Sequence, residues 1–257
     1  MKSFVMLFAA ASLFYLSGCA VLDLSSLDTA VPLKPGHVEA AVYLADGLDL
    51  SSAVVIEQVQ GSYEQSHDEK LSASGQLLGG LKANIGLFPG TELMLRAYES
   101  DGNGNNNTER WERNSTGYKA GLKIQCRKKE NTYISLAPAI NIVQGVSEHW
   151  DIENGDLLWK NLYDAYGFEL QTLYSEVVSK YLTFTGVVRA NVDFYSEDYH
   201  GVKYGTYTIF HYGMRGNMMI SVKPLFLILE LGGEYVPVVK GNSTFLPGLG
   251  FGVGLRF

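Results

Sequence analysis

The chain has 257 residues, a formal net charge of −7 and a mean hydropathy near zero. This length suits one large domain or two small ones. The acidic balance argues against nucleic acid as a partner, because domains that bind nucleic acid carry clustered positive charge. No run of eighteen apolar residues occurs, which argues against a membrane-spanning helix.

The N-terminal residues have the pattern of a secretory signal peptide. Lys2 is followed by an apolar stretch from Phe4 to Leu16, and a positive end before an apolar segment is the shape of such signals. Positions 16–19 then read Leu-Ser-Gly-Cys. This motif resembles the lipobox of bacterial lipoproteins at all four positions.

The lipobox resemblance implies that residues 1–18 are removed and that Cys19, carrying lipid such as palmitate, becomes the first residue of the mature protein. It also implies the lipoprotein-sorting machinery as a partner. Ala20 follows the cysteine and is compatible with transport to the outer membrane. We expect residues 19–36 to form a lipid-anchored linker before the folded domain.

Alternation with a period of two dominates the rest of the chain. In the last ten residues, Leu249, Phe251 and Val253 alternate with glycines, and Arg256 continues the glycine face. Such side chains lie on opposite faces of a β-strand, and no helical period competes over comparable lengths. The pattern predicts about ten strands, within residues 37–45, 76–87, 92–97, 118–125, 133–142, 166–171, 182–194, 207–218, 225–234 and 248–257.

Long and short connections between these strands alternate strictly, with long segments at 46–74, 100–115 and 144–163. This alternation is typical of a transmembrane antiparallel up-and-down β-barrel, here of 8–12 strands, lying in outer-membrane lipid. An even strand number would place both ends of the barrel, residues 37–257, on the periplasmic side. A lipid on Cys19 would then lie in the inner leaflet.

The last strand resembles the C-terminal signal that the bacterial barrel assembly machinery reads in outer-membrane proteins. Gly252, Leu255 and Phe257 match its glycine, apolar and aromatic positions, whereas Gly250 replaces its usual polar residue. The resemblance implies an outer-membrane location in a Gram-negative bacterium, with that machinery as a partner. It indicates a superfamily and no individual function.

The polar face of the predicted strands should line the lumen of the barrel. Buried charges must be paired, and ten strands enclose little more than side chains can fill, so we expect a closed, salt-bridged interior. At the seam, Arg256 should point inward near Glu39, His37 or Glu230. The predicted network comprises Glu39, Lys82, Arg96, Lys119, Lys123, Glu169, Arg189, Arg215, Glu230, Glu234 and Arg256, with Glu92 and Asp193 on the same face.

Three histidines are candidates for catalysis at the rim of the barrel. His149 and His200 each follow a serine and a carboxylate within one segment, and His211 lies in a predicted strand. Proximity within one segment does not make a catalytic triad. The sequence also matches neither the catalytic residues of omptin proteases nor those of lipid A deacylases.

One polar segment resembles a calcium-binding loop. Asp101, Asn103, Asn105 and Glu112 fall at positions 1, 3, 5 and 12 of that pattern. The glycine usual at position 6 is replaced by Asn106, and no flanking helices are predicted. An ordinary polar loop is the simpler interpretation, with Ca²⁺ as the one cofactor that the sequence suggests.

These features together predict a lipid-anchored outer-membrane barrel with a structural or surface-interaction role, carried by its external segments and an unidentified extracellular ligand. A narrow channel for small solutes is one alternative. An enzyme sited at the rim, either a protease or a lipid A-modifying enzyme, is the other.

Overall fold

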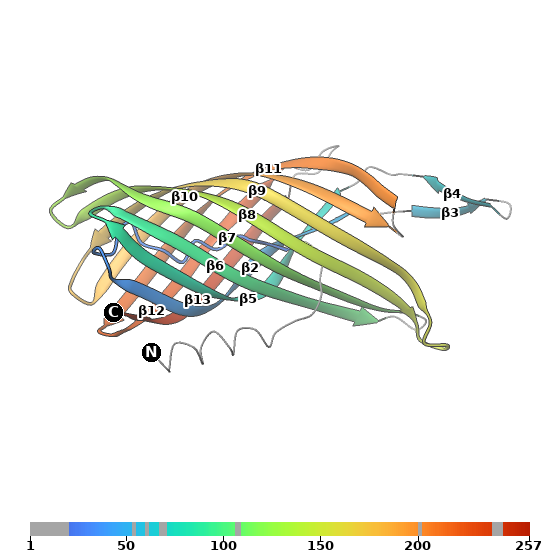
Figure 1. Ribbon diagram of the computed structural model, residues 1–257, viewed down its shortest axis with the longest axis horizontal. Helices are drawn as coiled ribbons and strands as arrows, with labels where there is room; N and C mark the ends of the chain where they lie inside the picture. Colours follow the sequence, from blue (N-terminus) through green and yellow to red (C-terminus); the bar gives the residue numbers. More distant parts are fainter. Residues whose placement is uncertain are drawn as a thin grey trace.

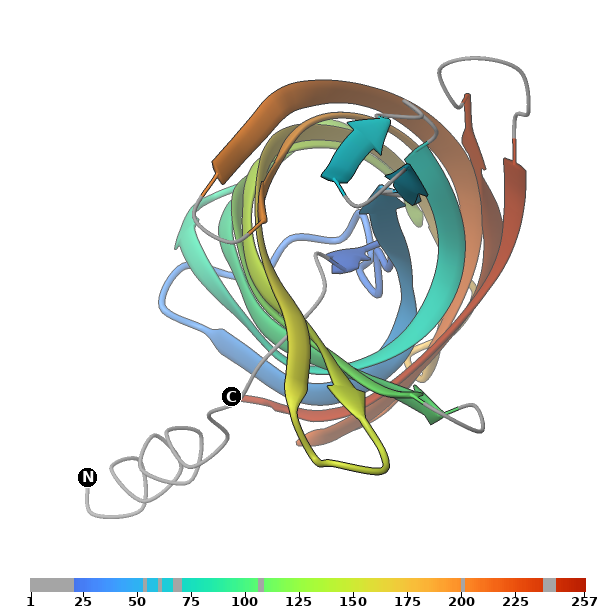
Figure 2. The same cartoon turned by 90° about the vertical axis from the view of Figure 1, so that its right-hand side faces the viewer.

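The computed structural model describes residues 21–52, 55–59, 62–66, 71–105, 109–199, 202–237 and 244–257. Ten long antiparallel strands form a closed barrel (Figures 1 and 2), which confirms the predicted all-β architecture. They are β2 (Val38–Ser52), β5 (Leu71–Phe88), β6 (Thr91–Asn105), β7 (Glu109–Lys129), β8 (Thr132–Asp151), β9 (Leu157–Val177), β10 (Leu182–Tyr199), β11 (Val202–Val222), β12 (Leu225–Val236) and β13 (Thr244–Arg256).

The barrel closes where β2 meets β13. β2 pairs with β5 over its whole length, from Val38 to Ser52, but with β13 only from Glu39 to Ala45. Phe257 extends this seam, because its backbone N donates to Val38 O at 2.9 Å and its O accepts from Val38 N at 3.2 Å.

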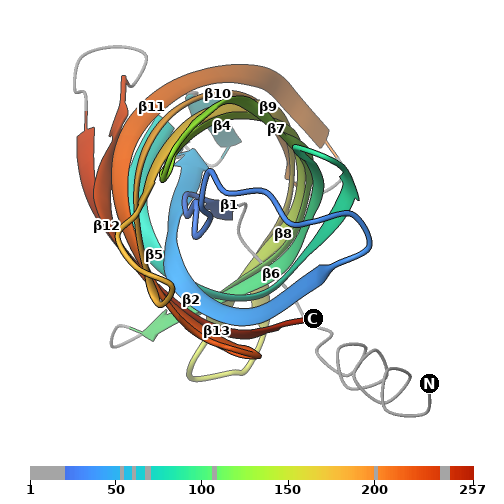
Figure 3. The same ribbon diagram turned by 90° about the vertical axis from the view of Figure 1, so that its left-hand side faces the viewer.

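The two ends of the barrel differ in their connections. Four tight turns lie at one end of the barrel, the end where Val38 of β2 meets Phe257 (Figure 3). They are at 89–90, 130–131, 178–181 and 223–224. Short turns face the periplasm in barrels of this kind. We call this the inner end, and the opposite rim the outer end.

The outward face of the strands is apolar, and the inward face is polar. Leu77 and Met214 are 64% and 68% exposed, as side chains in contact with lipid would be. Towards the outer end, on β7 to β9, the last rung whose outward side chains are all large and apolar is that of Tyr118, Ile142 and Tyr166. On the next rung outward, Thr116 pairs with Gln144, and Gln144 with Asp164. No helix in the described part of the chain is long and apolar enough to cross a membrane.

Several strands continue past the apolar band at the outer end. β7 and β8 stay paired up to Glu109 and Asp151. The segments 100–115 and 144–163, predicted to be loops, are therefore mostly paired strand, and that prediction is wrong. Segment 100–115 is polar on both faces, and 144–163 carries apolar residues such as Leu157, Leu158 and Leu162 without a regular alternation. Neither gives the apolar period of a strand, but paired backbones still satisfy their own hydrogen bonds. The segment 46–74 includes the hairpin of β3 (Val55–Val59) and β4 (Ser62–Ser66).

Proline cannot donate a ladder hydrogen bond, and this would favour a bulge at Pro138. Pro138 instead pairs in register with Leu170 of β9. On its other side the β7–β8 register shifts between Gln125 and Arg127, so the bulged residue is Cys126. Cys126 is exposed.

Residues 21–33, which precede the barrel, lie inside it (Figure 3). A three-residue strand, β1 (Val21–Asp23), pairs with β2 between Gly47 and Asp49. Residues 21–30 are all buried, and at the inner end Gly36 N donates to Gly86 O at 2.8 Å. The described part of the expected linker, here called the luminal segment (residues 21–33), thus fills the lumen.

Candidate functional site

Glycines in β13 make room for the luminal segment. A Cβ added to Gly250 would lie 3.2 Å from Leu27 Cδ2, and one added to Gly248 would lie 2.6 Å from Arg215 Nη2. The alternate glycines of the last strand therefore leave the space that the segment and a long luminal cation occupy.

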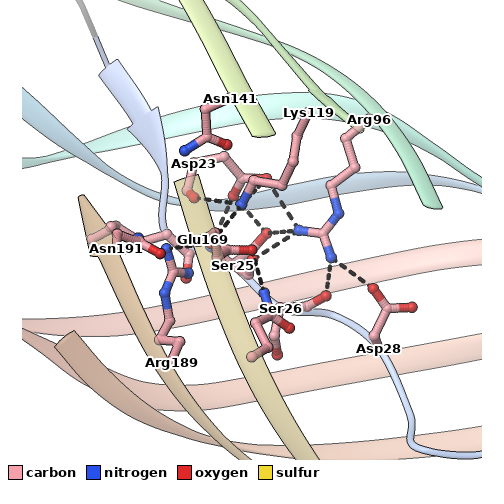
Figure 4. Close-up of polar contacts among 12 residues, drawn as sticks. Asp23, Ser25, Ser26, Asp28, Arg96, Lys119, Asn141, Glu169, Arg189 and Asn191 are labelled. Carbon is pink, nitrogen blue, oxygen red and sulfur yellow. Dashed lines mark hydrogen bonds and ion pairs between the residues drawn. The ribbon is translucent and has the colours of Figure 1, made fainter. Parts of the chain in front are cut away.

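Asp23 anchors the outer half of the luminal segment (Figure 4). Its Oδ2 lies 3.1 Å from Arg96 Nη1 and accepts from the Tyr43 hydroxyl at 3.0 Å. Its Oδ1 accepts from the Ser25 amide and hydroxyl at 2.8 and 2.6 Å. Lys119 Nζ donates to the Asp23 carbonyl at 3.0 Å. Asp23 is thus held by side chains from three strands, β2, β6 and β7.

Asp28 anchors the segment five residues further along. Its Oδ1 lies 3.0 Å from Lys82 Nζ and accepts from Asn84 Nδ2 at 2.7 Å, while Oδ2 accepts from Arg96 Nη2 at 2.8 Å. Lys123 Nζ lies 3.9 Å away and pairs with Glu92 at 2.7 Å. Arg96 therefore bridges both anchoring carboxylates.

Luminal Glu230 binds the turn between these two anchors. Its Oε2 accepts from the amides of Ser26 and Leu27 at 2.9 and 2.8 Å. Leu27 has a φ of 40°, a left-handed backbone conformation that residues other than glycine rarely adopt. Arg215 Nη1 holds the same carboxylate at 2.9 Å, so the barrel wall fixes the turn.

Serines hold the inner part of the segment. Ala30 N donates to Ser175 Oγ, and Ser135 Oγ donates to Ala30 O, both at 2.7 Å. Leu33 N donates to Glu92 Oε2 at 2.8 Å. Polar groups of the segment are thus satisfied by the wall along its whole length, as buried backbone requires.

The remaining luminal charges form a second cluster on β9 to β12. Arg189 Nη2 lies 2.8 Å from Glu169 Oε2, and its Nη1 donates to the Leu24 carbonyl. His211 lies between two carboxylates, with Nε2 and Nδ1 each 2.7 Å from Asp193 and Glu234. These groups are buried, and Lys119 of β7 supplies a further cation 3.1 Å from Glu169 Oε2.

At the seam, Arg256 points inward and contacts Glu39, one of its expected partners. Arg256 Nε donates to Glu39 Oε2 at 2.9 Å, and Glu39 Oε1 lies 3.0 Å from Lys82. The contact links the last strand to the first, and through Lys82 to the luminal segment.

Burial alone would raise the pKa of the Asp23 carboxyl. The cations Lys119 and Arg96, with the hydrogen bonds from Ser25, outweigh this effect and hold its pKa well below the usual range. Burial would likewise raise the pKa of Asp28, but Lys82, Lys123 and Arg96 lower it. Both groups are therefore ionised while the segment is docked.

The structure places all eleven residues of the predicted luminal network on the inward face, and all but the partly exposed Arg256 are buried. Sequence reasoning missed Asp23, Ser25, Ser26 and Asp28, which lie in the expected linker. A signal was present. β5, β6 and β7 carry four buried cations, Lys82, Arg96, Lys119 and Lys123, against one buried carboxylate, Glu92.

The residues of the predicted calcium loop lie along two paired strands and do not converge on one ion position. Asp101 and Asn103 lie on β6, and Asn103 pairs directly with Glu112 of β7, whose carboxylate contacts Arg110. Asn105 pairs with Arg110, and Asn106 lies outside the described residues. No cluster of three metal-binding side chains occurs in the described ranges.

The two candidate histidines among the described residues, His149 and His211, lie on β8 and β11, which are not neighbours in the sheet. In the described part of the chain, the side chain of His211 contacts carboxylates and Asn191 but no hydroxyl nucleophile. His149 lies on β8 opposite Trp159, and His200 lies outside the described residues, as do Cys19 and the signal peptide.

A closed ten-stranded barrel with an apolar outer band and a polar interior is the fold of outer-membrane β-barrel proteins. No known protein family matches the sequence, and no curated protein does.

Solved structures of outer-membrane proteins share the fold. The outer-membrane protease OmpT from Escherichia coli is 12% identical, with a TM-score of 0.53 over 90% of this chain and 99% of that chain. The translocator domain of the autotransporter NalP from Neisseria meningitidis is 13% identical, with a TM-score of 0.49 over 92% and 91%. At these identities the likeness concerns the fold alone.

Proposed function

We propose that the protein is a lipid-anchored outer-membrane barrel that is closed to solutes by its own luminal segment and presents its outer hairpins at the cell surface. The observation that carries this proposal is the docking of Asp23 and Asp28 onto cations from three strands, β5, β6 and β7. Buried ion pairs of this kind are costly to break one partner at a time, so the segment supports a closed resting state.

Conductance in planar bilayers tests the closure. The wild-type protein should carry no single-channel current at neutral pH. The double variant Asp23→Asn/Asp28→Asn and a deletion of residues 21–33 should both show openings, because the luminal cations lose their anchoring charges. Asp164→Asn, at an exposed carboxylate beyond the apolar band, is the matched control and should stay silent. Steady current through the wild type would favour the channel alternative.

Metabolic labelling tests the anchor. Radioactive palmitate should enter the wild-type protein and not Cys19→Ser, since the lipobox cysteine is the expected acceptor. An equal label in the variant would contradict lipidation at this residue. The remaining cysteine, Cys126, provides the control, because Cys126→Ser should keep the label.

A further inference from the structure

The luminal segment has a direction, and this direction limits where the residues before it can lie. Val21 pairs with Asp49 of β2, eleven residues beyond Val38 at the inner end. With a rise of about 3.3 Å per residue and a strand tilt of about 40°, Val21 lies roughly 28 Å from the inner rim along the barrel axis. The segment therefore runs from the inner end almost to the outer end.

A second contact independently gives the position of Val21 along the barrel axis. Val21 N donates to Ser115 Oγ at 3.0 Å. Ser115 lies one residue further out than Thr116, whose rung already lies beyond the apolar band. The start of β1 is thus level with the outer boundary of the lipid-facing surface.

Cys19 precedes Val21 by two residues. Consecutive Cα atoms are 3.80 Å apart, so the two Cα atoms lie within about 7.6 Å of each other. A lipid on Cys19 cannot reach the inner leaflet while β1 is docked. We infer that the chain threads its lipid-bearing N-terminus outward through the lumen, so that the acyl chains enter the outer leaflet of the outer membrane. This inference rests on the lipidation proposed above and replaces the inner-leaflet position that strand parity suggested.

The barrel wall beside β1 provides the passage for these chains. β13 pairs with β12 from Thr244 to Leu255 but joins β2 only from Gly250 inward. Among the described residues, β13 has no backbone ladder partner on its β2 side at 244–249, because β1 occupies the β2 edge at 47–49. The Leu249 amide there donates instead to the Asp46 carboxylate of β2. Figure 2 shows the outer ends of β12 and β13, in red, standing away from the ring.

Apart from the Asp46 carboxylate, the side chains on either side of this unpaired stretch suit an acyl chain. On the inside, Val21, Leu48 and Leu246 belong to one buried apolar cluster. On the outside, Phe245 and Leu249 are 64% and 63% exposed on the lipid-facing surface. Acyl chains that start at Cys19 pass from an apolar interior to lipid without crossing a paired backbone ladder.

A disulfide that locks β1 in place tests the inference. Leu22 and Leu48 are direct partners, and such pairs have the Cα separation that a disulfide needs. Leu22→Cys/Leu48→Cys would be made on a Cys126→Ser background in full-length protein, and cells would be labelled with radioactive palmitate. A maleimide-linked polymer then separates molecules with free thiols from cross-linked molecules on a gel.

The cross-linked molecules should carry the same palmitate per molecule as the others. Label confined to molecules without the cross-link, or no cross-link at all, would overturn the inference. A normal cross-link with no label in any molecule would instead refute lipidation itself, and the inference with it. Leu22→Cys/His37→Cys is the control, because His37 lies at the inner end. A labelled cross-link there would place the segment in the periplasm and overturn the inference.

A photoreactive palmitate analogue tests the passage. After incorporation and illumination, the adducts within the chain should map to the outer part of β13, around residues 244–249. Adducts concentrated at the inner rim, on Phe88 or Phe257, would overturn the proposed path.

Discussion

Lys82, Arg96, Lys119 and Lys123 place four positive charges on three neighbouring strands, and Asp23 and Asp28 supply the negative charge that balances them. The alternation in each strand was sufficient to predict that the four cations face inward. It could not predict their partners, because the two aspartates lie in a segment without any alternation. In the sequence, only the overall balance of charge connects the four cations with the two aspartates.

The depressed pKa values of Asp23 and Asp28 make the docking of the segment dependent on pH. A carboxyl whose pKa is lower in the folded protein contributes stability above its unfolded pKa, near 3.9, and this stability is lost as the pH falls through the folded value. We therefore expect the urea midpoint of the folded barrel, followed by its heat-modifiable mobility on gels, to be constant between about pH 7 and pH 5 and to fall below about pH 4.

Asp28→Asn tests the origin of this dependence. It leaves Lys82 and Arg96 short of a buried counter-charge, so it should lower the free energy of unfolding at pH 7 by about 3 kcal/mol. The loss of stability at acidic pH should also become smaller. Asp164→Asn should change neither quantity. An unchanged acid response in Asp28→Asn would show that other carboxylates control it.

At the scale of the strands, sequence reasoning gave the barrel, its ten strands and the inward face of the last one. It failed where the outer hairpins have no regular apolar alternation, as in 100–115 and 144–163, and where a strand has three residues, as in β1. An apolar period cannot identify either, because the first is held by backbone pairing and the second by its place in the lumen.

At the seam between β2 and β13, the contribution of the Arg256–Glu39 contact to the free energy of unfolding can be measured. Arg256→Met leaves the Glu39 carboxylate, whose side chain is 3% exposed, sharing Lys82 with Asp28. We expect a loss of about 1–2 kcal/mol in the free energy of unfolding, partly restored by adding Glu39→Gln, because the unpaired buried charge is the costly state.

Arg110→Met is the matched control for the seam, since Arg110 pairs with Glu112 at an exposed site. Exposed pairs contribute about 0–1 kcal/mol, so this variant should remain close to wild type. A double variant at the seam that is less stable than Arg256→Met would show that Glu39 stabilises the barrel through Lys82 rather than through Arg256.

At the scale of the whole molecule, the luminal segment and the seam depend on one another. β1 takes the outer part of the β2 edge, which leaves β13 only seven residue pairs with which to close the barrel. The two backbone hydrogen bonds between Phe257 and Val38 lengthen this short seam. Closure therefore depends on the last residue more than it would in a barrel whose first and last strands pair throughout.

Deletion of Phe257 should accordingly slow assembly, because it removes both hydrogen bonds and an aromatic side chain that is 59% exposed at the inner rim. The measurement is the fraction of heat-modifiable, folded protein against time after a pulse of synthesis. Phe257→Tyr should behave as wild type, since it keeps the backbone bonds and the interfacial ring. Phe88→Ala removes another exposed aromatic from the same rim, 68% exposed but away from the seam, and should have the smaller effect. Equal delays in Phe88→Ala and the Phe257 deletion would show that the rim needs aromatic rings in general, and that the seam gains nothing from its final residue.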